Sequence, residues 1–165
     1  MRKVIRLILV FVAAVIVFFV VRHLLQTDRD RIQAVIDKGI AAIESDSPLI
    51  VQTRLMDCLS DNYRHRGERV GMTIDRAVAS QYLLGIKQSG YSDFQVEVKT
   101  LRIEITEDTA RAEITGRITA SNAANPGERT EVLTDGGRHK AVLEFRKEEE
   151  GWRIVSSERQ ALPLE

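Results

Sequence analysis

The sequence predicts an α+β domain in which three helices precede a curved antiparallel sheet and pack on it, with one transmembrane helix ahead of them. Two observations lead to this fold class. Apolar residues recur at helical spacing in three segments between positions 28 and 90. From position 94 onward apolar and polar residues alternate instead, which is typical of strands with one buried face. Such a sheet must cover its apolar face, and the helices are the elements available to do so.

An apolar run near the amino terminus predicts the transmembrane helix. Residues 7–21 are fifteen consecutive positions without a polar side chain. The wider segment 4–25 can cross a hydrocarbon core of about 30 Å, because the basic side chains near its ends can reach the headgroups. A cleaved signal peptide is the alternative, but no small-residue cleavage site follows the run. We expect residues 1–26 to be an uncleaved signal anchor in contact with the lipid bilayer, and residues 27–165 to be the domain.

The composition of the domain excludes several classes of function. Beyond residue 26 the chain carries 20 basic and 24 acidic side chains, whereas nucleic-acid binding usually requires a basic excess. Cys58 is the only cysteine, so it excludes an internal disulfide or a zinc site built on several thiolates, and we expect it to be buried. The histidines His23, His65 and His139 are too widely spaced to make a recognisable metal site. We expect no metal and no other cofactor.

Three helices are expected in the first half of the domain. Thr27 or Asp28 caps the first, which ends near residue 44 and carries Gly39 on its apolar face, a position that predicts close approach of another helix. Ser47 and Pro48 start the second helix, which breaks at residues 60–63. Residues 64–69 are expected to form a charged loop or short hairpin. Thr73 opens the third helix, and the pair at 89–90 closes it.

At least four long antiparallel strands are expected in the second half. Residues 94–105 alternate, but the phase slips at Thr100, which predicts a β-bulge. A turn at 107–108 leads to a second strand over 110–120, and residues 121–137 are expected to form a long connection. The final two strands are expected around residues 141–145 and 152–158. A bulged, one-sided sheet wrapped over helices makes a cone that can hold a pocket at its open end.

Several short sequence segments resemble those of the nuclear transport factor 2-like superfamily, also called the cystatin-like or polyketide-cyclase-like cone. They are spread over roughly residues 28–160 and comprise 59–63 at a helix end, the charged turn ending at Gly67, 73–76 at a helix start and 151–155 on a closing strand. Members of this superfamily range from isomerases and dehydratases to catalytically silent binding modules, so the resemblance implies a fold and assigns no activity. Bacterial secretion-system assembly proteins of the superfamily share the layout of one span and one cone. This implies a bacterial inner-membrane location. The short amino-terminal tail, with its basic charges close to the apolar run, favours the amino terminus inside and the domain outside the cytoplasm.

The candidate site residues are Tyr63, His65, Tyr82 and Trp152. Tyr63 and His65 belong to a mixed polar cluster that could bind an anion or act as a base near neutral pH, although a solvated loop of mixed charge is the preferred interpretation. Tyr82 and Trp152 could line a pocket, although such residues are more often part of a core. No set of residues suggests a catalytic centre.

Two functions compete on this evidence. The preferred one is a non-catalytic binding or assembly module, which would recruit a protein partner or a second copy of itself through the outer sheet face. The alternative is an enzyme or carrier for a small apolar molecule held inside the cone. A cone filled with side chains, with no polar group pointing inward, would exclude the alternative.

Overall fold

The computed structural model describes residues 27–66, 73–132 and 139–161. No helix within these ranges is long and apolar enough to cross a membrane. The predicted span over residues 4–25 lies outside the described residues. The elements are α2 (Asp28–Glu44), α3 (Pro48–Cys58), β1 (Leu59–Arg66), β2 (Thr73–Asp75), α4 (Arg76–Gln88), β3 (Tyr91–Thr106), β4 (Thr109–Asn122), β5 (Asn125–Glu131), β6 (His139–Glu148) and β7 (Gly151–Ala161).

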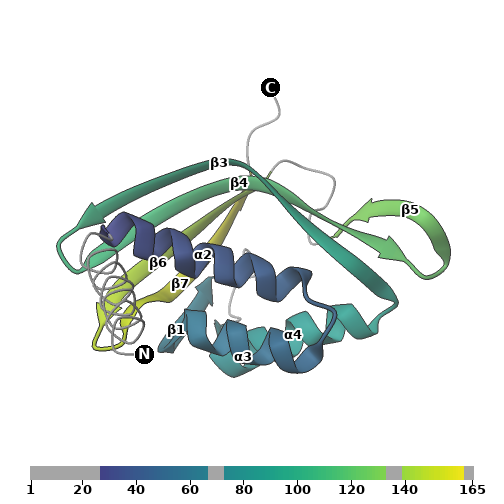
Figure 1. Cartoon of the computed structure of the whole chain (residues 1–165), viewed down its shortest axis with the longest axis horizontal. Coiled ribbons are helices and arrows are strands. Elements are labelled where there is room, and N and C mark those ends of the chain that lie inside the picture. Colours follow the sequence, from purple (N-terminus) through teal and green to yellow (C-terminus); the bar gives the residue numbers. More distant parts are fainter. Residues whose placement is uncertain (1–26, 67–72, 133–138, 162–165) are drawn as a thin grey trace, which may run out of the picture.

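The α+β class and the three helices are confirmed, but the sheet is mixed rather than antiparallel. The strand order is β2-β1-β7-β6-β4-β3, with β5 paired to β4. β1 runs parallel to β7, whereas the other described pairs are antiparallel. Figure 1 shows the three helices together on one side of the sheet, with the long β3–β4 hairpin curving over α2. This is the predicted cone.

The short hairpin that was one of two expectations for residues 64–69 is borne out in part, since residues 64–66 pair with residues 73–75. The rest of β1, residues 59–63, was not predicted as a strand, because it carries mostly polar side chains. The strand buries Leu59 and Tyr63 but exposes Asp61, Asn62 and Arg64. Its backbone is held by pairing with β7 on one side and β2 on the other. Tertiary pairing therefore overrides the weak local signal for a strand.

The helix starts follow the expected capping chemistry with one shift. The Thr27 hydroxyl accepts a hydrogen bond from the Asp30 backbone N–H, and the Asp30 carboxylate accepts one from the Thr27 N–H, which completes a capping box for α2. Pro48 occupies the first turn of α3 as predicted. The third helix begins at Arg76 rather than Thr73, because Asp75 is its cap and residues 73–75 pair with β1 as β2.

The strand register confirms the predicted bulge and corrects the predicted connection. The β3–β4 register shifts between Val98 and Thr100, where the sequence slips phase. Residues 121–137 are not one loop, since Asn125–Glu131 forms β5 against β4. Asn and Gly are typical of turns and loops, so their presence in this segment predicted a loop. The same residue types also occur in a hairpin, here the one that β5 forms with β4.

Two clusters of buried side chains fill the space between helices and sheet. The larger cluster packs α2 against β6 and β7 through Ile32, Phe145, Trp152 and Ile154. Cys58 is fully buried in this cluster, as expected. The smaller cluster, at the other end of α2, consists of Phe94, Ala120 and Val132 with partly buried neighbours. The region between them is not filled.

Candidate functional site

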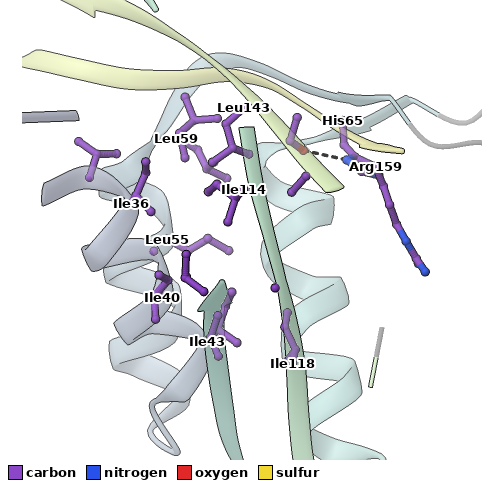
Figure 2. Close-up of a pocket in the computed structure, with 18 of the residues that line it drawn as sticks. Ile36, Ile40, Ile43, Leu55, Leu59, His65, Ile114, Ile118, Leu143 and Arg159 are labelled. Atoms are coloured by element: carbon purple, nitrogen blue, oxygen red, sulfur yellow. Dashed lines mark hydrogen bonds between the residues drawn. The ribbon is translucent and has the colours of Figure 1, made fainter. Parts of the chain in front are cut away.

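A cavity of about 390 Å³ lies between α2 and the inner face of the sheet. Figure 2 shows Ile36, Ile40 and Ile43 of α2 on one side and Ile114 and Ile118 of β4 on the other. Leucine, valine and alanine side chains from α2, α3, β1, β3 and β6 extend this aliphatic lining, namely Val35, Leu55, Leu59, Val96, Val98, Ala141 and Leu143. The volume is within the usual range for sites that hold small molecules, which is roughly 300–1,000 Å³.

Two glycines line the cavity for different reasons. A Cβ at Gly39 would meet no atom within 4 Å, so the missing side chain leaves open space inside the cavity. The predicted close approach of another helix at Gly39 is therefore wrong. A Cβ at Gly116 would instead overlap the Glu97 carbonyl oxygen, because β3 approaches β4 closely beside the bulge. The absent side chain at Gly39 therefore enlarges the cavity, and the absent side chain at Gly116 allows the β3 backbone to approach β4.

The lining is not wholly aliphatic, since it also includes the charged residues Glu97, Arg117, Glu158 and Arg159. A hydrogen-bonded cluster is formed there by Tyr63 and His65 of β1 and Ser157 of β7. The hydroxyl oxygens of Tyr63 and Ser157 lie 2.6 Å apart. The Nδ1 atom of His65 lies 2.8 Å from the same Ser157 oxygen. All three residues line the cavity, and Figure 2 marks the His65 hydrogen bond at one end of it. The parallel pairing of β1 with β7 places His65 directly beside Ser157.

Burial controls the charge of this cluster. Removal from water lowers the pKa of His65 below its ordinary value, and a hydrogen bond with the Ser157 backbone partly opposes that change. Burial also raises the pKa of Tyr63, with the Ser157 hydrogen bond again acting in the opposite direction. At neutral pH the cluster is therefore an uncharged set of donors and acceptors. It can orient a polar group of a bound molecule or exchange a proton with it.

The two other predicted site residues lie away from the cavity. Trp152 is 3% exposed and belongs to the larger core cluster, where its Nε1 donates a hydrogen bond of 3.1 Å to Asp28. Tyr82 lies on α4 and is 59% exposed. Neither side chain lines the cavity.

Sequence reasoning missed Ser157 and misread Gly39. Alternate positions counted from Trp152 and Ile154 lead to Ser156, but the β6–β7 register shifts beside Phe145, so the count does not find Ser157. No local signal in the sequence therefore identified Ser157 as an inward residue. Gly39 could have been read as missing volume as easily as helix contact, because both explanations place a glycine on an apolar helix face.

Paired charges lie across neighbouring strands of the sheet. Arg117 of β4 donates to the Glu97 carboxylate of β3 at 2.5 Å, and both residues are also among those that line the cavity. Lys140 of β6 lies 3.2 Å from Glu113 of β4. These are cross-strand pairs of the kind expected from the alternating charges. The prediction that a protein partner or a second copy binds the outer sheet face stays a prediction.

No family model and no curated protein sequence matches this chain. Solved structures do match in three dimensions. A protein from Novosphingobium aromaticivorans described as nuclear transport factor 2-like with a cystatin-like fold is 16% identical, with a TM-score of 0.65 over 89% of this chain and 90% of that one. A nuclear transport factor 2-like protein from Salmonella enterica is 15% identical, with a TM-score of 0.64 over 83% and 92%. The hexachlorocyclohexane dehydrochlorinase LinA-type3 from Novosphingobium barchaimii is 13% identical, with a TM-score of 0.63 over 82% and 86%.

These similarities confirm the nuclear transport factor 2-like, cystatin-like fold and correct the preferred function. The structural neighbours include an enzyme that acts on a small chlorinated molecule. The cone of this chain is hollow, and Ser157 and His65 place polar groups at the cavity. The expectation of a non-catalytic binding or assembly module was therefore wrong, and these findings favour the alternative. The reason for the error is that inward positions of the strands read as wholly apolar when Ser157 was overlooked.

Proposed function

We propose that this protein is an enzyme or carrier that takes a small apolar molecule into the cavity between α2 and the sheet. The observation that carries this proposal is the aliphatic lining of a cavity of about 390 Å³. Empty apolar volume weakens a fold, because the surrounding atoms lose contacts that a filled core would make. An apolar molecule in the cavity would restore those contacts.

The Tyr63–Ser157–His65 cluster favours an enzyme over a carrier. An imidazole at the wall of a largely aliphatic cavity can exchange a proton with a bound molecule, and its hydrogen bond to Ser157 fixes the ring. A structural neighbour, the dehydrochlorinase, is an enzyme on a small apolar substrate, which supports the same reading by analogy of fold alone.

The test uses a pair of glycine variants and a neutral fluorescent probe, N-phenyl-1-naphthylamine. Gly39 and Gly85 both lie in helices, and a Cβ at either meets no atom within 4 Å, but Gly39 lines the cavity and Gly85 is exposed on α4. Gly39→Leu should reduce probe affinity at least about tenfold by occupying the cavity, whereas Gly85→Leu should leave it unchanged. The full-length chain is measured in phosphatidylcholine nanodiscs, with the signal of empty nanodiscs subtracted. Equal affinity in both variants would show that the probe binds elsewhere.

We also propose that residues 1–26 anchor this domain, residues 27–165, in a bacterial inner membrane with the domain outside the cytoplasm. The support is the apolar run at 7–21 with basic residues on both sides. After expression in bacteria, alkaline carbonate extraction should leave the chain in the membrane pellet. Added protease should digest the domain in spheroplasts without lysis. Release by carbonate, or protection from protease until lysis, would contradict the anchor or its orientation respectively.

A further inference from the structure

The cavity between α2 and the sheet is closed where it adjoins the packed core. Ile36, Leu59 and Ile154 line the cavity there, and their exposed fractions are only 4%, 5% and 7%. All three belong to the larger core cluster, so this part of the lining is continuous with packed side chains. We refer to it as the closed end. The part of a ligand that reaches the closed end meets buried apolar side chains.

The cavity opens to solvent at another point. Val98 lines the cavity and is 38% exposed, and Ala141 also lines it and is exposed. Val98 pairs with Gly116 and Ala141 with Ile114, and these two partners lie on the same face of β4 and line the cavity. Opposite residues of an antiparallel pair share a face of the sheet. Val98 and Ala141 are therefore on the inner face, and their exposure marks the mouth of the cavity.

Two of the charged residues that line the cavity compensate each other. Glu97 of β3 and Arg117 of β4 form an ion pair across the strands at 2.5 Å. About half of each side chain is exposed, at 51% for Glu97 and 53% for Arg117. The pair is neutral as a unit, so it selects neither sign of charge on a ligand.

Glu158 and Arg159 are neighbours on β7 that differ in their position relative to the cavity. Arg159 pairs with Ala141 at the mouth, whereas Glu158 pairs with Val142, which is not among the residues that line the cavity. Successive residues of a strand point to opposite faces, so Arg159 shares the inner face with Ala141. Figure 2 shows the Arg159 side chain beside His65, extending away from the labelled aliphatic residues. Its positive charge is therefore at the mouth and not among the aliphatic side chains.

From this arrangement we propose that the cavity binds an amphiphile with an apolar body and one anionic group, such as a medium-chain carboxylic acid, with the carboxylate at the mouth beside Arg159. This inference rests on the proposed function and narrows its ligand class. The apolar body contacts the aliphatic lining, and the carboxylate keeps part of its hydration because the mouth is open. Guanidinium groups form charge-assisted hydrogen bonds with carboxylates. Arg159 also interacts within the chain, but its five N–H donors allow it to hold a carboxylate as well.

The first test compares decanoate and 1-decanol, which share an alkyl chain and differ in charge. Both should displace N-phenyl-1-naphthylamine from the full-length chain in nanodiscs at pH 7.5. Arg159→Gln should weaken decanoate binding about fivefold and leave 1-decanol binding unchanged, because it removes the charge at the mouth. Arg159→Lys keeps the charge and should retain most of the decanoate affinity. Arg117→Gln is the matched control, since it removes a lining arginine that is already paired with Glu97, and it should leave the ratio of the two affinities unchanged.

Each contrary result has a distinct meaning. Unchanged decanoate binding in Arg159→Gln, or equal losses for the two ligands, would overturn the assignment of the carboxylate to Arg159. An equal loss of decanoate binding in Arg117→Gln would overturn it as well, because the effect would then follow net charge and not position. Failure of both ligands to displace the probe from the wild type would count against the proposed function instead.

The second test determines the orientation of the ligand and needs no variant. Nuclear Overhauser contacts are recorded between decanoate and the methyl groups of the carbon-13-labelled full-length chain, in nanodiscs of deuterated lipid. The terminal methyl of decanoate should contact Ile36 and Ile154 at the closed end, and the methylene beside the carboxylate should contact Val98 at the mouth. The reverse pattern would overturn the placement of the carboxylate while leaving the cavity as the binding site. Contacts with none of the three would count against the proposed function.

Discussion

The interface between α2 and the sheet has two halves that share their secondary structure and differ in side-chain volume. In the packed half, Ile32 of α2 meets Phe145 of β6 and Trp152 of β7, and these side chains are almost fully buried. In the hollow half, the same helix presents Gly39 and Ile40 to a cavity. The sheet opposite contributes Gly116 and Ala141 there, with Ile114 beside them.

The difference shows that residue size, and not the arrangement of helices and strands, determines where this fold is hollow. Phe145 and Ala141 both lie on β6, yet one fills the interface and the other leaves room. Aromatic residues bury large areas and dominate core energetics. Glycine and alanine in the hollow half have too few side-chain atoms to fill the same space. The packed half therefore stabilises the fold, and the hollow half is free to hold a ligand.

The largest expected effect is the loss of an aromatic side chain from the packed half. Phe145 is 1% exposed, and Phe145→Ala should lower the free energy of unfolding by about 3–5 kcal/mol. Ile40→Ala in the hollow half removes atoms that already face a cavity, so its cost should be about 2 kcal/mol or less. Chemical denaturation of the full-length chain measures both values. Similar costs at the two positions would contradict the division into packed and hollow halves.

A smaller effect distinguishes the two glycines of the hollow half. Gly116→Ala adds a methyl group against the Glu97 carbonyl oxygen and should destabilise the fold by about 1–3 kcal/mol. Gly39→Ala adds the same group into open space within a helix, where alanine is preferred by up to about 1 kcal/mol. The two variants should therefore move the denaturation midpoint in opposite directions. A stabilising Gly116→Ala would show that β3 and β4 can separate at the bulge.

A weaker effect should appear in the pH dependence of stability. Because the pKa of His65 is lower in the folded protein than in the unfolded chain, the unfolded chain takes up this proton first as the pH falls. The contribution is complete above the unfolded pKa of about 6.5 and is lost as the pH falls from there toward the folded pKa. In His65→Gln the free energy of unfolding should fall less steeply between pH 7 and pH 5.5 than in the wild type. Parallel curves would show that His65 is not buried in the folded state.

The smallest effect is an absence of reaction at Cys58. Burial in the packed half raises the pKa of this thiol to about 11, so little of the reactive thiolate exists at pH 8. A thiol reagent such as Ellman's reagent should not react with the folded chain within minutes, and should react fully after denaturation in urea. Rapid reaction in the native state would mean that the packed half opens readily.

Local patterns in the sequence were enough to predict much of this fold. Helical spacing located α2 and α3, Pro48 marked the start of α3, and the phase slip at Thr100 located the bulge. Each of these features depends on residues close together in the chain. The parallel β1–β7 pair depends on residues nearly a hundred positions apart, and the polar composition of β1 gave no local sign of it.

The site was harder to predict for the same reason. Tyr63 and His65 were selected for their chemistry, but their shared partner Ser157 is brought to them only by the β1–β7 pairing. Trp152 and Tyr82 were selected as large aromatic residues, and size alone does not tell whether a residue fills a core, lines a cavity or faces solvent. The cavity itself arises from absent side chains, which a search for chemically active residues does not detect.

The most direct test of the account follows isoleucine methyl groups by carbon-13 NMR while the full-length chain in nanodiscs is titrated with N-phenyl-1-naphthylamine. Ile40, Ile43 and Ile118 line the cavity, whereas Ile32 and Ile103 lie in the packed cluster. The account predicts saturable shifts in the first group and little change in the second. Shifts spread equally over both groups, or none in the cavity group at saturating ligand, would contradict the claim that the hollow half is a binding site.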